Sequence, residues 1–242
     1  MPLERVLEPE VMDSPNEALD YDAMNHRAVN QSFVTDLLGA AAGPLADYRQ
    51  QLEAGTEVGR FEVLDLGTGT AQIPIELCRQ NDEVSVLACD LAASMLDLAI
   101  RNIDVAGFRQ RILLSQTDAK ELPYPDGRFA IVMSNSIVHH IPQPSVALRE
   151  AVRVLAPGGL IFIRDLLRPG DDVTIRHLVA TYAADGNQSQ RDLFEASLRA
   201  ALSLDEIRAI VAELGCPPER VVATSDRHWT WSARTGGLSA RE

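Results

Sequence analysis

Cysteine is scarce in this chain of 242 residues, with three in total at Cys78, Cys89 and Cys216. No two of them have the Cys-x-x-Cys spacing of a zinc site or a redox motif, and an odd number does not suit a disulfide framework. We therefore expect no metal site, and we expect a reducing, cytoplasmic setting.

Long apolar runs and basic residues are also few. No run reaches the roughly 20 apolar residues of a membrane-spanning helix, and the acidic start of the chain lacks a signal-peptide pattern. The 22 Lys and Arg residues are outnumbered by 35 Asp and Glu residues, which gives a formal net charge of -13. Such a charge repels nucleic acid backbones and anionic lipid surfaces. We expect neither nucleic acid binding nor membrane insertion.

Apolar segments that alternate with helical stretches dominate the middle of the chain. The predicted strands are 61–66, 84–90, 111–115, 129–134 and 159–164, and the predicted helices are 71–80, 92–105 and 143–155. Strands that alternate with helices favour right-handed crossovers and a parallel sheet covered on both faces. Residues 220–224 and 228–233 resemble a final hairpin.

This pattern predicts three regions. Residues 1–59 form an N-terminal helical cap and linker, which begins with a polar arm up to about Ser14. Residues 60–235 form the core, interrupted by a helical substrate-side insertion at 171–214. Residues 236–242 form a tail.

A glycine turn follows the first predicted strand. Gly67-Thr68-Gly69 lets backbone N–H groups and a helix N-terminus face an anionic part of a ligand without a side chain between them. A dinucleotide site would have a third glycine at position 72, which is Gln72. Asp65 can accept hydrogen bonds from an ammonium group or from the amides of the turn.

Asp90 ends the second predicted strand, where a carboxylate can accept hydrogen bonds from both hydroxyls of a ribose. A helix N-cap is the alternative role. Leu91 and Met95 follow, either against a flat base or as ordinary core residues.

Four ordered blocks of the chain resemble the class I S-adenosylmethionine-dependent methyltransferases, especially the ubiquinone and menaquinone biosynthesis group. The blocks are 63–69 (VLDLGTG), Asp90-Leu91 with Met95-Leu96, 118–129 (DAKELPYPDGRF) and 153–159 (RVLAPGG). The resemblance implies an α/β, Rossmann-like fold with seven strands, mostly parallel, helices on both faces and an antiparallel strand in the C-terminal hairpin. The implied cofactor is S-adenosylmethionine, which leaves as S-adenosylhomocysteine.

The resemblance also implies roles for single residues. The Gly67 backbone would hold the methionine end of the cofactor, Asp90 the ribose, and Asp118 the adenine amine beside the Ala119 amide. Ser134 and Asn135 would pass the sulfonium. An Asx-turn at Asp118 and a strand-end turn at Ser134 and Asn135 remain alternatives.

The chain departs from the family at three positions. Ala71 stands where many members have a glycine, Ala92 where a capping Ser is common, and Ala130 where an Asp often follows Phe129. These positions affect turns and caps more than the identity of the site.

The predicted reaction is an in-line methyl transfer to a small-molecule acceptor, in which positioning supplies much of the catalysis. His139, His140 and Tyr21 are the catalytic candidates: the His pair follows the fourth strand, and Tyr21 precedes the core. Purely structural roles remain open for all three. Two other functions also remain open: a cofactor-binding protein without methyl transfer and an NAD-dependent dehydrogenase.

Overall fold

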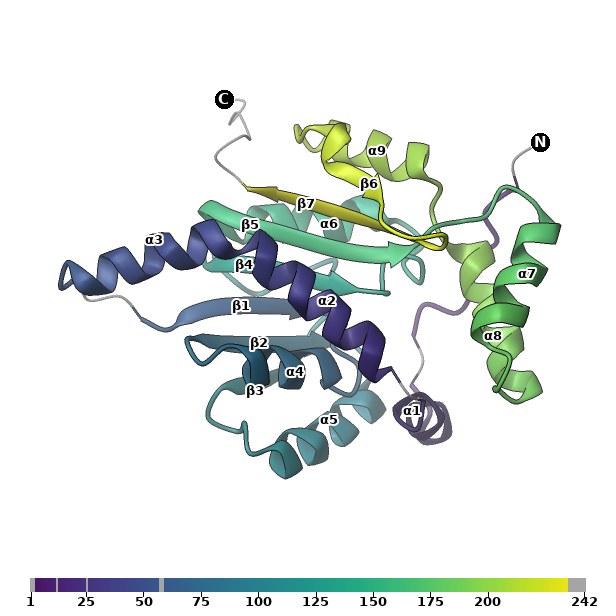
Figure 1. Ribbon diagram of the computed structural model, residues 1–242, viewed down its shortest axis with the longest axis horizontal. Coiled ribbons are helices and arrows are strands. Elements are labelled where there is room, and N and C mark those ends of the chain that lie inside the picture. Colours follow the sequence, from purple (N-terminus) through teal and green to yellow (C-terminus); the bar gives the residue numbers. More distant parts are fainter. Residues whose placement is uncertain (1–2, 12, 25, 57–58, 235–242) are drawn as a thin grey trace.

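A seven-stranded sheet forms the centre of the computed structural model, which describes residues 3–11, 13–24, 26–56 and 59–234 (Figure 1). The strand order is β3-β2-β1-β4-β5-β7-β6. The strands are β1 (Phe61–Leu66), β2 (Val84–Asp90), β3 (Ile112–Gln116), β4 (Phe129–Asn135), β5 (Leu155–Leu166), β6 (Val221–Ala223) and β7 (His228–Arg234).

The pairing of the strands confirms the predicted fold class. Strands β1 to β5 pair in parallel, whereas β7 runs antiparallel to both β5 and β6. The chain moves outward from β1 to β3 and then returns to place β4 on the other side of β1. Such a reversal opens a crevice at the carboxyl ends of the central strands, where open α/β sheets bind ligands.

Helices cover both faces of the sheet, as predicted (Figure 1). On one face, Phe33 and Ile75 pack into the same apolar cluster as Val63 of β1. On the other face, Leu148 and Ile207 join the cluster of Leu64. The first face is covered by α2 (Arg27–Ala40), α3 (Ala42–Glu53), α4 (Gln72–Gln80) and α5 (Ala93–Ala106), and the second by α6 (Pro144–Arg153) and α9 (Leu204–Glu213).

The inserted helices are fewer than expected. Helices α7 (Asp172–Tyr182) and α8 (Gln188–Ala200) pack on each other through Ile175, Leu178 and Leu198. Helix α9 instead covers the sheet, because Ile207 and Val211 are part of the core beneath it. Residues 171–214 thus contain one helix pair, α7 and α8, and one helix that packs on the sheet, α9, while a substrate-side insertion stays a prediction.

The described residues of the predicted polar arm, 3–11 and 13–14, pack against the molecule and form no helix or strand before α1 (Pro15–Asp22). The N–H of Val6 donates to the carbonyl of Arg199 at the end of α8. Asp13 accepts hydrogen bonds from the N–H and the hydroxyl of Ser94, each at 2.9 Å, at the start of α5. It supplies the side-chain cap that Ala92 cannot provide.

The C-terminal hairpin forms as expected, after the short helix η1 (Pro218–Arg220). The predicted tail, 236–242, lies outside the described residues. Among the helices that the structure describes, none has the length and apolar character needed to span a bilayer.

Candidate functional site

A cavity of about 140 Å³ lies at the carboxyl ends of β1, β2 and β4, in the crevice that the strand order creates. Its walls bring together residues from the glycine turn, the strand ends and the N-terminal segment. From the predicted site they include Tyr21, Gly67, Gly69, Asp90, Leu91, Met95, Asp118, Ala119, Asn135 and His140. Residues far apart in the sequence therefore meet at the edge of the sheet where the sequence placed the site.

The glycine turn has left-handed backbone at Gly67 (φ 70°), Gly69 (φ 54°) and Ala71 (φ 62°). A Cβ at Gly67 would lie 1.9 Å from Cγ2 of Ile137, so no side chain fits there. Ala71, where many family members have a glycine, keeps the same left-handed geometry at a cost of roughly 1–2 kcal/mol. The departure at position 71 thus leaves the shape of the turn intact.

Asp90 holds the turn in place. Its Oδ2 accepts a hydrogen bond from the Gly69 N–H at 2.7 Å, and its Oδ1 accepts one from the Ala92 N–H at 2.9 Å. Burial raises the pKa of this carboxyl. Each carboxylate oxygen has a second lone pair, so Asp90 can support the loop and still accept hydroxyls from the cavity side.

Asp65 precedes the turn in β1 and is buried, with 3% of its surface exposed. Its Oδ2 has no hydrogen-bond partner among the residues that the structure describes. Burial raises the pKa of Asp65 to about 7. A buried carboxyl oxygen without a hydrogen-bond partner, beside a glycine turn, matches the need of a ligand that carries an ammonium group.

Asp118 is fixed by its neighbours on the opposite wall. Its Oδ1 accepts a hydrogen bond from the Lys120 N–H at 2.8 Å, which is the Asx-turn geometry, and Oδ2 lies 3.2 Å from the Lys120 ammonium. Lys120 also pairs with Glu10 of the N-terminal segment. Hydrogen bonding of Asp118 to adenine stays a prediction.

Three of the predicted cofactor residues lie outside the cavity wall. Ser134 is buried, and its hydroxyl donates to the Leu66 carbonyl at 2.8 Å, so it links β4 to β1. Asp65 and Thr68 lie just beneath the wall. Asn135 lines the cavity, and it is followed by Ser136, which has left-handed backbone (φ 61°).

The three catalytic candidates occupy different positions. His140 lines the cavity, and His139 lies behind it, fully buried, with Nδ1 at 2.5 Å from Oδ1 of Asp165. Burial, together with His139, lowers the pKa of His140 to about 4. Tyr21 covers the turn, since a Cβ at Gly69 would lie 3.6 Å from its ring, and burial raises the pKa of Tyr21 to about 12.

Residues of the N-terminal segment also contribute to the cavity, and no local sequence pattern predicts them. Glu10 and Val11 line the cavity, and Glu8 lies against both histidines. Their segment has no helical or strand periodicity, and its contacts cross more than a hundred positions of the chain. Only long-range packing places them at the site.

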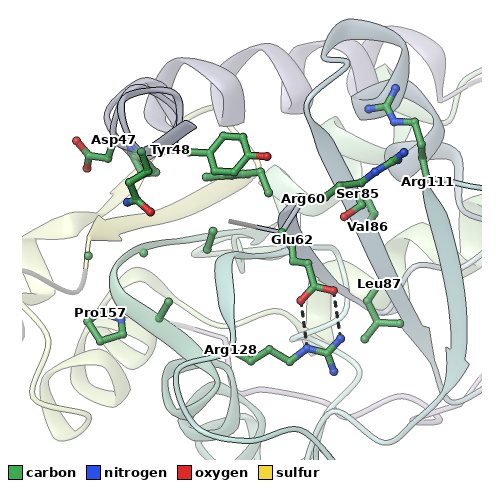
Figure 2. Close-up of a pocket in the computed structure, with 18 of the residues that line it drawn as sticks. Asp47, Tyr48, Arg60, Glu62, Ser85, Val86, Leu87, Arg111, Arg128 and Pro157 are labelled. Atoms are coloured by element: carbon green, nitrogen blue, oxygen red, sulfur yellow. Dashed lines mark hydrogen bonds and ion pairs between the residues drawn. The ribbon is translucent and has the colours of Figure 1, made fainter. Parts of the chain in front are cut away.

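A larger cavity, of about 740 Å³, opens at the amino ends of the strands and contains none of the predicted residues (Figure 2). Figure 2 shows Glu62 paired with Arg128 across it. At its rim, Arg234 pairs with Asp47 at 2.7 Å. Both acidic side chains of this cavity, Glu62 and Asp47, are thus paired with arginines, and none of the predicted site residues lines it, so size does not make it the better site.

Comparisons with known proteins concern the family and the fold. Residues 64–163 match the family model described as "Methyltransferase domain". The chain is 32% identical over 158 residues to 27-O-demethylrifamycin SV methyltransferase from Amycolatopsis mediterranei, covering 65% of this chain and 54% of that protein. It is also 32% identical over 121 residues to demethylmenaquinone methyltransferase from Thermus thermophilus, covering 50% and 54%. The chain thus spans about half the length of these relatives.

Two solved structures show the same fold. A SAM dependent methyltransferase from Aquifex aeolicus has a TM-score of 0.56 at 20% identity, with 84% of this chain and 97% of that chain covered. The plantazolicin methyltransferase BpumL in complex with SAH has a TM-score of 0.60 at 16% identity, with 88% and 76% covered. Residues 64–163 thus match a methyltransferase-domain model, and the described part of the chain has the same Rossmann-like fold as the SAM dependent methyltransferase from Aquifex aeolicus.

Proposed function

We propose that the protein is an S-adenosylmethionine-dependent methyltransferase that acts on a small-molecule acceptor. The observation that carries this proposal is the arrangement of Gly67, Gly69, Asp90 and Asp118 around one cavity, with the buried carboxyl of Asp65 outside its wall. The turn would take the methionine end of the cofactor, Asp90 the ribose and Asp118 the adenine.

The residues present fit that cofactor on structural grounds. The unpartnered Oδ2 of Asp65 would face the methionine end, and the turn has no side chain that fills the space at Gly67. Asp90 would accept the ribose hydroxyls, while Leu91 and Met95 border the base. The bound cofactor supplies a methyl group that its sulfonium already activates for displacement.

Cofactor binding requires the cavity to widen, since ligand sites commonly measure about 300–1,000 Å³. Tyr21, Glu10 and Val11 cover the cavity and come from segments that precede the core. Their outward displacement would enlarge the cavity without any change in the sheet. The N-terminal segment therefore acts as a cover in this proposal.

On the acceptor side, His140 is the group that contacts the substrate. A base whose pKa is about 4 is weak near neutrality, so its main contribution is to orient the acceptor and exclude water. His139 and Asp165 position its loop from behind. Tyr21 shields the turn on the opposite side.

The acceptor class follows from the names of the relatives. One acts on demethylrifamycin SV and another on demethylmenaquinone. Oxygenated ring compounds, such as phenols and quinols, are therefore the first acceptors to test. The net charge of -13 disfavours nucleic acid as the acceptor.

Methyl transfer is tested directly with the purified chain, S-adenosylmethionine and a panel of phenols, quinols and hydroxylated polyketides. The expected result is S-adenosylhomocysteine formed in equal amount to a methylated product identified by mass spectrometry. Binding of the cofactor with no turnover on any acceptor class would favour a non-catalytic cofactor-binding protein. Full turnover in His140→Ala would remove His140 from the mechanism.

A further inference from the structure

The His pair and the N-terminal segment form a cluster of potential metal ligands that the proposed methyl transfer does not require. We propose that Glu8, His139 and His140 bind a divalent transition-metal ion of the zinc class. One ligand atom from each residue lies within 4.8 Å of the other two. The cluster joins the 139–140 turn to a segment more than 130 positions earlier in the chain.

The distances suit a tetrahedral ion. Oε1 of Glu8 lies 3.4 Å from Nε2 of His139 and 3.2 Å from Nδ1 of His140. Bonds of 2.0–2.1 Å at tetrahedral angles separate neighbouring ligand atoms by about 3.3–3.4 Å. An ion can therefore take the space between the three atoms with only small side-chain movements.

Two of the three ligand atoms have no hydrogen-bond partner among the described residues. Oε1 of Glu8 and Nδ1 of His140 are buried and make no hydrogen bond within the described part of the chain. The Glu8 side chain is 8% exposed and that of His139 is 4% exposed. Leaving such atoms unpaired away from water is costly, and a bound cation removes that cost.

A second layer of contacts orients the ligands. Oδ1 of Asp165 lies 2.5 Å from Nδ1 of His139, so Nδ1 holds a proton and Nε2 is directed to Glu8. The hydroxyl of Ser197 donates to the other oxygen of Glu8 at 3.3 Å. A carboxylate behind a metal-binding imidazole is the usual support of such sites.

Arg5 lies beside the cluster without pairing with its carboxylate. Arg5 donates from its guanidinium to the carbonyls of His139 and Ile141, each at 3.0 Å, and to that of Ala200 at 2.6 Å. No contact joins it to the carboxylate of Glu8 among the described residues. Arg5 fixes the loop that carries the ligands and does not neutralise them.

Two imidazoles and one carboxylate leave at least one coordination position open, as in catalytic zinc sites. Because His140 also lines the cavity, the ion lies beside the acceptor. There it would bind an acceptor oxygen and lower its pKa, which removes the need for a strong protein base. This role rests on the proposed function, whereas metal binding itself does not.

The test uses the full chain, stripped with a chelator and titrated with Zn²⁺ and, separately, Co²⁺, without cofactor or acceptor. The expected result is one ion per chain and a cobalt absorption spectrum typical of tetrahedral coordination. Glu8→Gln and His140→Ala are expected to weaken binding by about 100-fold or more. Circular dichroism verifies that each variant is folded.

Matched controls remove one Glu and one His from exposed positions, Glu213→Gln and His177→Ala, and both should bind the ion like the parent chain. The proposal is overturned if the parent chain binds no stoichiometric Zn²⁺, or if Glu8→Gln binds it as tightly as Glu213→Gln. Since the experiment contains no S-adenosylmethionine, its failure leaves the methyltransferase proposal to be judged on cofactor binding alone.

Discussion

Gly67 is the residue of the glycine turn at which an added Cβ atom would collide with a neighbouring side chain. Its Cβ would meet Ile137 at 1.9 Å, and its φ of 70° is strained for any other residue. We expect Gly67→Ala to destabilise the fold by about 2–4 kcal/mol, from overpacking and left-handed strain together. Chemical denaturation measures the change in the free energy of unfolding.

Gly107 provides the control for this experiment. It has φ 79° but no atom within 4 Å of an added Cβ, so Gly107→Ala introduces the strain without the collision. Gly107→Ala should lower the free energy of unfolding by less than Gly67→Ala does. Adding Ile137→Ala to Gly67→Ala removes the collision and should recover part of the lost stability. Equal losses in the two single variants would refute steric exclusion at Gly67.

Asp65 is expected to make stability depend on pH. Its pKa is raised to about 7 in the folded state, against about 3.9 when unfolded, so between these values the folded state binds more protons. Stability therefore decreases as pH rises through this window. We expect the stability advantage of Asp65→Asn, a neutral amide of similar shape, over the parent chain to grow by about 1–3 kcal/mol between pH 5 and pH 8.

Denaturant unfolding at both pH values gives this difference, and Asp82→Asn, at a fully exposed carboxylate, is the control. A difference between Asp65→Asn and the parent chain that stays constant from pH 5 to pH 8 would show that Asp65 is ionised in both states.

Single residues could be predicted where the signal is local. Gly67, Asp90 and Asp118 follow strand ends within short motifs, and all three line the cavity. Ser134 lies on the predicted strand, but its hydroxyl donates to the Leu66 carbonyl and does not reach the cavity. Side chains alternate between the two faces along a strand, and this alternation determines which of them face the cavity. Glu8 carries no local signal, since only its contact with the distant histidines gives it a role.

At the scale of elements, the N-terminal segment is the part whose position depends most on a few contacts. Arg5 joins it to the 139–141 turn and to the end of α8, and Glu10 joins it to Lys120. We expect Arg5→Met to remove these hydrogen bonds while keeping much of the side chain's length, at a cost of about 1–3 kcal/mol.

Hydrogen–deuterium exchange measures the effect, as faster exchange at residues 3–11 in Arg5→Met than in the parent chain. Arg109→Met, which breaks an exposed pair with Asp104, should leave that segment unchanged. Unchanged protection of residues 3–11 in Arg5→Met would show that apolar packing, and not Arg5, holds the segment.

The helices and strands with strong hydrophobic periodicity could be predicted from the sequence, but the residues at which they begin and end could be predicted less closely. The parallel strands and their helices lie within a few residues of the expected ranges, whereas β5 begins at Leu155 and not at 159. Helix α9 was assigned to the insertion because its amphipathic pattern does not state which surface it covers. Hydrophobic spacing reveals that a face is buried, and tertiary packing selects its partner.

At the scale of the whole molecule, the alternation of strands and helices predicts the parallel core of the sheet, whereas the antiparallel strand at its end was implied by the family resemblance. The order β3-β2-β1-β4-β5 reverses direction at β1, and this reversal brings Gly67, Asp90 and Asn135 to one crevice. The closure of that crevice by residues from before the core could not be predicted, since no rule of strand order governs it.

The folded molecule should be stabilised as a unit by its cofactor. Binding to the native state alone adds about 2.7 kcal/mol at a ligand concentration 100 times the Kd. For a chain of this size, such a gain raises the Tm by about 5–10 °C. A thermal unfolding series with S-adenosylhomocysteine tests this, and a Tm that is independent of its concentration would contradict binding.

Calorimetric titration of the chain with S-adenosylmethionine, S-adenosylhomocysteine and NAD tests the central claim most directly. Both adenosyl ligands should bind with one site per chain, NAD should not bind, and Asp90→Ala should weaken binding by about 100-fold, or near 3 kcal/mol. Binding of NAD alone, or unchanged affinity for S-adenosylmethionine in Asp90→Ala, would contradict the assignment of this cavity.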